Sequence, residues 1–198
     1  ISERKQRTYP IKGFTGVHDF IYKNDQALII SAYKDGQSDL FYYNLKDGSS
    51  EQITRDVYFD HSARLLPNSD QLVFISNRPV TAGSEQGNSS NLFLLHADAR
   101  ITALTRYGNN VHLSRPLAYG NNHIWYLCDV SGIVNSWQID WKDSIPAPQS
   151  LTNYKRSILY QDYASENNLL AELLLIDGRY KIFITESDGL QKEVPVSN

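Results

Sequence analysis

Two of the five histidines in this sequence stand beside an aspartate, and imidazoles are the side chains best suited to proton transfer near neutral pH. The pairs are His18-Asp19 and Asp60-His61, and each directly precedes an expected first strand of a repeat. Their loops could bring them together as metal ligands or as a proton relay, or the histidines could simply be satisfied by neighbouring backbone. No His-Glu-x-x-His pair and no close cysteine–histidine cluster supports a zinc site. We expect these four residues to bind a ligand or partner, with no metal and no other cofactor.

The sequence lacks the motifs that activate a nucleophile or cradle a phosphate. It contains no Gly-x-Ser-x-Gly elbow and no phosphate-binding glycine loop. Its single cysteine, Cys128, aligns with Ser31 and Ser76 of two other repeats, which indicates a small structural residue. Burial there would raise the pKa of the thiol and quench its reactivity. We therefore expect no enzymatic activity from these residues.

The elements that must position these side chains are short strands arranged in a long repeat. Three similar phrases, Ile53-Thr54-Arg55, Leu104-Thr105-Arg106 and Leu151-Thr152-Asn153, place their threonines 51 and 47 residues apart. A period of this length, filled with short alternating strands, indicates a β-propeller in which each repeat is one blade of about four strands. The sequence therefore predicts an all-β fold.

Each repeat contains a nearly continuous apolar run, which is typical of a second strand covered on both faces. A turn, a third strand and a short outer strand with the Leu-Thr phrase follow it. The innermost first strands are more polar, which suits strands lining a central channel, so their charged residues Arg115 and Asp162 are further binding candidates. The apolar runs are Ala27–Ser31, Leu72–Ser76, Ile124–Cys128 and Leu169–Leu175, and the expected first strands are Phe20–Tyr22, Ala63–Leu66, Arg115–Tyr119 and Asp162–Ala164.

The segment Ala63–Arg78 resembles the WD-like repeat of TolB-type propellers. That family favours a Ser-Pro-Asp-Gly turn, an apolar strand, Ser-Asn-Arg and a closing Leu-Thr; here Pro67-Asn68-Ser69 stands in place of Pro-Asp-Gly. The resemblance covers residues 17–190 at the level of repeats and is strongest in the second one. It implies a propeller scaffold, and propellers of this repeat type include periplasmic scaffolds, sensor domains and peptidase domains.

We expect an N-terminal arm or linker at residues 1–16 and propeller repeats at residues 17–198. The four expected four-stranded blades are residues 17–56, 57–108, 109–155 and 156–198. Because the resemblance implies rings of six or more blades, three arrangements stay open. The chain forms an open arc of a larger ring with a missing segment, a ring completed by a second copy, or a small ring that closes alone. An arc would expose the apolar faces of its end blades, which favours self-association or a partner segment.

One segment, Pro79–Ser90, is longer than the matching turn in the other repeats. It is rich in small and polar residues, and loops on a rigid scaffold frequently carry binding function. The alternative is a tolerated surface insertion. We include Val80, Ser84, Glu85 and Asn88 among the candidate binding residues.

Composition restricts the class of protein further. The formal net charge is −3, so no basic field favours nucleic acid, and no apolar stretch reaches the ~18 residues of a membrane span. A single cysteine is compatible with the cytosol or the bacterial periplasm. The sequence begins at Ile1 and contains no methionine, from which we expect a processed chain or an excised fragment.

These observations favour a non-catalytic binding or scaffold module of a bacterial protein, expected in the periplasm, that presents loops to a protein or a small ligand. One alternative is the periplasmic sensor domain of a membrane-anchored transcriptional regulator, in which the basic N-terminal arm would follow a membrane helix. The other is the substrate-gating propeller of a prolyl-oligopeptidase-like or tricorn-like peptidase whose catalytic domain lies outside this chain.

Overall fold

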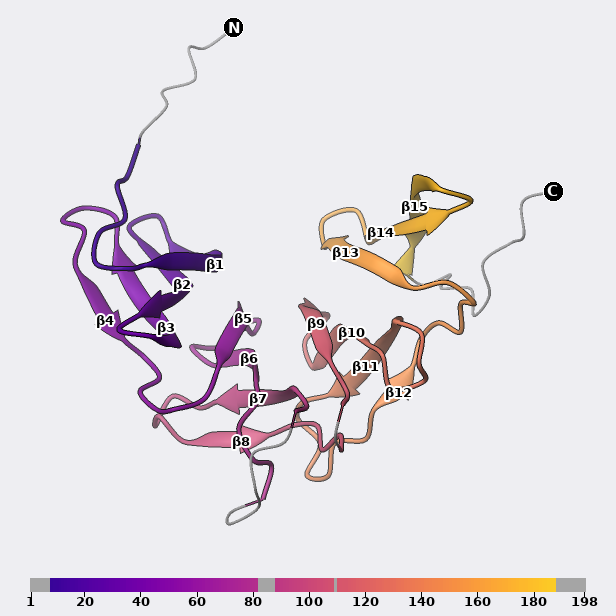
Figure 1. The fold of residues 1–198 in the computed structure, drawn as a ribbon, viewed down its shortest axis with the longest axis horizontal. Coiled ribbons are helices and arrows are strands. Elements are labelled where there is room, and N and C mark those ends of the chain that lie inside the picture. The colour runs from indigo at the N-terminus through magenta and orange to yellow at the C-terminus, as the bar shows by residue number, and fades with distance from the viewer. Residues whose placement is uncertain (1–7, 82–87, 109, 188–198) are drawn as a thin grey trace, which may run out of the picture. The chain divides into compact units, whose positions relative to one another are not determined.

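The computed structural model describes residues 8–81, 88–108 and 110–187, and it confirms the all-β prediction (Figure 1). These residues form four antiparallel sheets and contain no helix long and apolar enough to cross a bilayer. Each sheet is built from strands that follow one another in the sequence, as in a propeller blade. Contacts divide the chain into two compact units, residues 1–63 and 64–198.

The four sheets are numbered here as blades 1 to 4 in chain order. Blade 1 consists of β1 (Gly16–Asn24), β2 (Ala27–Lys34), β3 (Gln37–Asn44) and β4 (Ser50–Gln52). Blade 2 consists of β5 (Asp60–Leu65), β6 (Leu72–Ser76), β7 (Asn91–Leu95) and β8 (Ile101–Ala103). Blade 3 consists of β9 (Leu113–Tyr119), β10 (His123–Cys128), β11 (Asn135–Asp140) and β12 (Gln149–Ser150). Blade 4 consists of β13 (Ile158–Ala164), β14 (Leu169–Ile176) and β15 (Arg179–Glu186); residues 188–198, where we expect its outer strand, lie outside the described residues.

The first strands begin earlier than the sequence predicts. β1 already includes His18 and Asp19, and β5 begins at Asp60, so the two candidate pairs lie within strands and not in the loops before them. The missed start has a local cause. Pairing of β1 with β2 skips His18 between Val17 and Asp19, and this bulge interrupts the alternation by which a strand is recognised.

The Leu-Thr phrase is explained by a hydrogen-bonded clamp that closes blades 1, 2 and 3. In blade 3 the Thr152 hydroxyl accepts a hydrogen bond from the Ser136 amide (2.9 Å) and donates one to Asn135 Oδ1 (2.9 Å). The same oxygen accepts the Tyr154 amide at 2.7 Å. Outer strand β12 ends at Ser150, so the phrase follows the outer strand, and the prediction that this strand carries the phrase is wrong.

Equivalent residues build the clamp in the other two blades. Blade 2 uses Thr105 and Asn91 at 2.9 Å, and blade 1 uses Thr54 and Asp39 at 3.2 Å. The clamp also corrects the alignment of the repeats. Asp39 pairs with Ala32, whereas Asn135 pairs with Cys128, so the blade 1 residue equivalent to Cys128 is Ala32 and not Ser31. The prediction of a small structural residue holds, because Cys128 is fully buried in the core.

Apolar side chains from successive blades pack into shared cores within the second unit. Val73, Ile75 and Leu92 of blade 2 pack with Tyr126 and Cys128 of blade 3. A separate cluster joins Leu127 of blade 3 to Ile158 and Leu174 of blade 4. In the first unit, Leu28, Ile30 and Phe41 pack with Phe14 from the segment that precedes β1. The second strands of blades 1, 2 and 3 are thus covered on both faces, as their continuous apolar runs predict. The same prediction for Leu169–Leu175 is wrong, because β14 is fully buried only at alternate residues.

Candidate functional site

Four rings, two of them the predicted histidines, lie together in the first unit and form the strongest candidate site of the described residues. The His18 ring centroid lies 4.5 Å from Tyr33 and 5.3 Å from Phe59. Phe59 in turn lies 5.1 Å from His61. We call His18, Tyr33, Phe59 and His61 the ring cluster. The structure thus brings the two predicted histidines to one place, through two aromatic residues that sequence analysis did not single out.

The ring cluster combines an exposed imidazole with a largely buried one. His18 is exposed, whereas His61 is half-buried and its Nδ1 lies 3.0 Å from the Ser62 hydroxyl. Burial lowers the pKa of His61 to about 4, helped by the like charge of His18 and opposed by Asp19. His61 is therefore neutral at pH 7, and the cluster presents aromatic surface and neutral hydrogen-bonding nitrogen at that residue.

Asp60 belongs to a second group in the same unit. One carboxylate oxygen each of Asp39, Asp56 and Asp60 lies within 4.8 Å of the others, so this group has the donor atoms to hold a divalent cation. Asp39 already has a structural task, since it accepts hydrogen bonds from Gln52 Nε2 (2.8 Å) and from Thr54 of the clamp. Burial raises its pKa. Blades 2 and 3 perform the same task with neutral asparagines, so the clamp explains the position of Asp39 but does not require its charge.

The sequence contains a pattern that distinguishes Asp39 from its equivalents in the other repeats. Aligning the third-strand segments Asp39–Leu45, Asn91–His96 and Asn135–Trp141 of the sequence at their first residues gives one acid in a column of amides. Tyr33 and Phe59 carried no comparable signal, because their contacts with His18 depend on how β2 and the segment before β5 come together.

The candidates Arg115 and Asp162 lie in the second unit. The Arg115 guanidinium stacks over the Tyr160 ring at 4.0 Å, and its backbone has a positive φ of 51°. Gln161 Nε2 donates a hydrogen bond to the Arg115 carbonyl at 3.0 Å. Asp162 Oδ1 accepts the amide of the next residue, Tyr163, at 2.9 Å. Both residues belong to first strands, as expected, and the stacking on Tyr160 accounts for the position of the guanidinium.

The insertion in blade 2 is described only at its ends. Val80 is half-buried and Asn88 is exposed, whereas the candidates Ser84 and Glu85 lie outside the described residues. At the last residue of the insertion, Ser90 Oγ accepts a hydrogen bond from the Leu113 amide at 2.8 Å. Its C-terminal end is therefore anchored at the start of blade 3.

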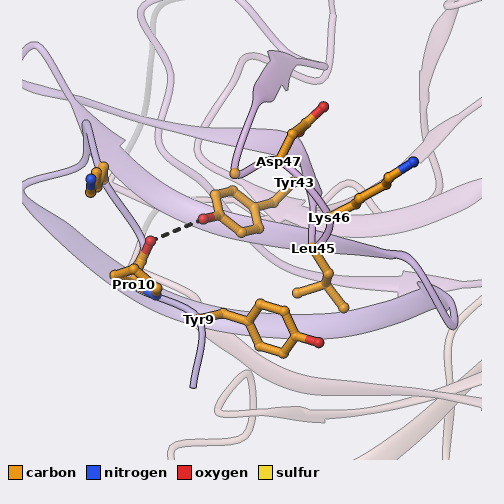
Figure 2. Close-up of a pocket in the computed structure, with 8 residues that line it drawn as sticks. Tyr9, Pro10, Tyr43, Leu45, Lys46 and Asp47 are labelled. Carbon is orange, nitrogen blue, oxygen red and sulfur yellow. Dashed lines mark hydrogen bonds between the residues drawn. The ribbon is translucent and has the colours of Figure 1, made fainter. Parts of the chain in front are cut away.

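A shallow pocket of about 350 Å³ lies in the first unit, where the segment before β1 crosses blade 1 (Figure 2). The Tyr43 hydroxyl donates a hydrogen bond to the Pro10 carbonyl at 3.1 Å and so holds the segment in place. Tyr9 and Leu45 supply apolar walls, and the β3–β4 turn supplies polar ones. None of the predicted site residues lines this pocket, whose lining is Tyr9, Pro10, Lys12, Tyr43, Leu45, Lys46, Asp47 and Gly48.

No family model and no curated protein matches the sequence. Solved structures do match. TolB from Acinetobacter baumannii has 13% identity and a TM-score of 0.66, over 84% of this chain and 39% of that one. A puromycin-hydrolyzing peptidase of Mycobacterium tuberculosis has 13% identity and a TM-score of 0.68, over 90% of this chain and 31% of that one. Putative TolB from Agrobacterium tumefaciens reaches a TM-score of 0.71 at 13% identity, over 92% of this chain and 66% of that one.

This chain therefore spans less than two thirds of each of these proteins. Identities this low establish the fold alone. The match agrees with the sheet order, in which each blade runs from first to last strand in sequence. The resemblance expected from Ala63–Arg78 is confirmed at this level, and the chain has the TolB-like β-propeller fold.

Proposed function

We propose that this chain is a non-catalytic binding module that works outside the cytoplasm and recognises a protein partner through the ring cluster. The observation that carries the proposal is the contact of His18 on β1 with Tyr33 on β2 and with Phe59 just before β5, at 4.5 and 5.3 Å. Aromatic side chains give large contact area for little loss of conformational entropy, and they are enriched where proteins meet.

The same cluster is poorly equipped for catalysis. A hydroxyl beside an imidazole, as in Ser62 and His61, is the first requirement of a serine nucleophile. An efficient general base has a pKa near the working pH, however, and burial holds the pKa of His61 at about 4. The Cys128 thiol is fully buried and its pKa is raised to about 11, so it is a poor nucleophile as well.

The test is a partner screen with a matched control. Tagged wild-type chain, His18→Ala and Val57→Ala are used to capture cross-linked proteins from cells that make the native protein, and the captured protein is identified and its Kd is measured. Val57 is 71% exposed and takes no part in the ring cluster. We expect His18→Ala to weaken binding at least tenfold and Val57→Ala to leave it unchanged. Equal affinity of all three would place recognition elsewhere, and peptide hydrolysis that disappears in His61→Gln would overturn the non-catalytic proposal.

A second candidate, supported by the peptidase matches, is a propeller that gates access to a catalytic domain. This chain covers 31% of the puromycin-hydrolyzing peptidase and 26% of a prolyl endopeptidase, so a catalytic domain would have to be supplied by further sequence. A third is the sensor domain of a membrane-anchored regulator. Adjoining genomic sequence decides among them: a hydrolase domain supports gating, a membrane helix with a DNA-binding domain supports sensing, and neither is expected for the scaffold.

A further inference from the structure

Successive blades in the second unit pack through the same two faces. The second strand of each blade points alternate residues to opposite sides. Ile75 and Leu92 lie on the side of blade 2 that contacts blade 3, which we call the leaving face. On blade 3 they pack against Tyr126 and Cys128 of β10, which lie on what we call the entering face.

The next interface repeats this arrangement. Leu127, the residue of blade 3 equivalent to Ile75, packs against Ile158 and Leu174 of blade 4. A polar contact accompanies this apolar packing: Ser136 Oγ donates a hydrogen bond to Gln161 Oε1 at 2.9 Å. Two interfaces between different blades thus use equivalent positions, so the faces belong to the repeat and not to one pair of blades.

The leaving face of blade 4 has the same composition and is exposed. Leu173 is the equivalent of Leu127 and Ile75, and it pairs with Ile182 across the sheet. Ile182, Ile184 and Tyr180 are 69%, 68% and 72% exposed, whereas the residues of β7 equivalent to the two isoleucines are buried in blade 2. An apolar row this exposed on a face that is buried elsewhere in the chain marks a surface for association.

In the first unit, the entering face of blade 1 exposes two aromatic residues of β1. Phe20 and Tyr22 pair with Ile30 and Leu28, and they are 57% and 68% exposed. Their equivalents in blade 4 are Gln161 and Tyr163, which pair with Glu172 and Leu170. Both of these contact blade 3, Gln161 through Ser136 and Tyr163 through a ring contact of 5.6 Å with Trp125.

The segment before β1 already covers the part of this face that lies over β2 and β3. Phe14 meets Phe41 of β3 edge to face at 4.8 Å, and Pro10 accepts the hydrogen bond of Tyr43. Phe20 and Tyr22 on β1 are left open beside it. Blade 1 therefore offers an apolar aromatic edge with the same register as the faces that blades 3 and 4 use internally.

We propose that the leaving face of blade 4 binds the entering face of blade 1 of a second copy of this chain. The argument is continuity: two interfaces of this design exist within the second unit, the leaving face of blade 4 exposes an apolar row, and blade 1 exposes Phe20 and Tyr22 at the edge of its entering face. Since the two surfaces differ, the contact is heterologous, and one copy can use both of its faces at once.

Sedimentation velocity over a concentration series tests this, with Ile182→Lys on the leaving face and Phe20→Lys on the entering face. Ile145→Lys is the matched control, because Ile145 is 83% exposed in the segment between β11 and β12. We expect the wild type and the control to form dimers or larger species, and each face variant to require at least tenfold higher concentration to associate. Circular dichroism verifies that both variants remain folded.

Mixing the two face variants gives the sharpest result. Each lysine variant keeps the face that the other lacks, so the mixture should form a dimer that neither variant forms alone and that grows no further. A wild type that stays monomeric at every concentration, or a mixture that fails to pair, would overturn the proposal. The result is independent of partner recognition, since His18→Ala leaves both faces intact and should sediment like the wild type.

Discussion

Acid should destabilise this protein through His61, and the size of the effect follows from the surroundings of that side chain. The free imidazole has a pKa of 6.5, whereas burial beside Phe59 and the like charge of His18 lower the pKa of folded His61 to about 4. Between pH 6.5 and pH 4, His61 is therefore protonated in the unfolded chain but neutral in the folded one. Stability contributed by neutral His61 is complete above pH 6.5 and is lost as the pH falls toward 4.

The magnitude follows from the difference of about 2.5 pKa units at about 1.4 kcal/mol each, which gives about 3 kcal/mol at pH 4 and about 2 kcal/mol at pH 5. Urea unfolding followed by tryptophan fluorescence at pH 7.5, 6.5, 5.5 and 4.5 measures it. Other groups titrate in this range, so the quantity of interest is the difference between the wild type and His61→Gln. That difference should shift by about 2 kcal/mol toward the variant between pH 7.5 and 5.

His18→Gln serves as the second variant. It removes the like charge but leaves the burial of His61, so its acid loss should be slightly smaller than that of the wild type. Two parallel curves for the wild type and His61→Gln, or a folded-state imidazole resonance of His61 that titrates near 6.5, would refute the reasoning.

Three further results are expected. Thr152→Val should lower the free energy of unfolding by about 1–3 kcal/mol, seen in thermal denaturation, because it strands the buried Ser136 amide; an unchanged Tm would show that the clamp contributes nothing. Burial raises the pKa of Cys128 to about 11, so a thiol reagent at pH 8 should label it only in denaturant, and rapid native labelling would contradict its burial. Burial also raises the pKa of Glu172, which accepts a hydrogen bond from Tyr154, so the folded protein loses stability as the pH rises above about 4.5. Glu172→Gln should therefore stabilise the protein at pH 8 and much less at pH 4. An equal effect at both pH values would exclude a titrating carboxyl.

The fold could be predicted from the sequence because its signals are local and recur. The apolar run of each second strand and the Leu-Thr phrase appear at nearly constant spacing, and short hairpins connect neighbouring strands. The predicted strand boundaries were less accurate where the backbone departs from the alternation of inward and outward side chains. The bulge at His18 concealed the start of β1, and the clamp moved Thr54 and Thr152 beyond the outer strands in which they were expected.

The candidate site was predictable only in part, for a physical reason. His18 and His61 stand out by residue type, and the structure does bring both of them against Phe59. Tyr33 and Phe59, which make the cluster a surface, look like ordinary aromatic residues until their strands are placed. Glu172 was missed because its neighbours in β14 form an ordinary apolar strand pattern. In the structure its carboxylate accepts a hydrogen bond from the Tyr154 hydroxyl within the packed interface.

The clamp also bears on the order in which the chain acquires its structure. Its side-chain hydrogen bonds in blades 1, 2 and 3 join residues only 13 to 19 positions apart in the sequence. Closing so short a loop costs little entropy, and contacts of low sequence separation form quickly. Each of these three blades can therefore fold as a nascent unit as soon as its own threonine has left the ribosome. Lasting stability must wait for the following blade, whose arrival buries the apolar face that the clamp has already set in register.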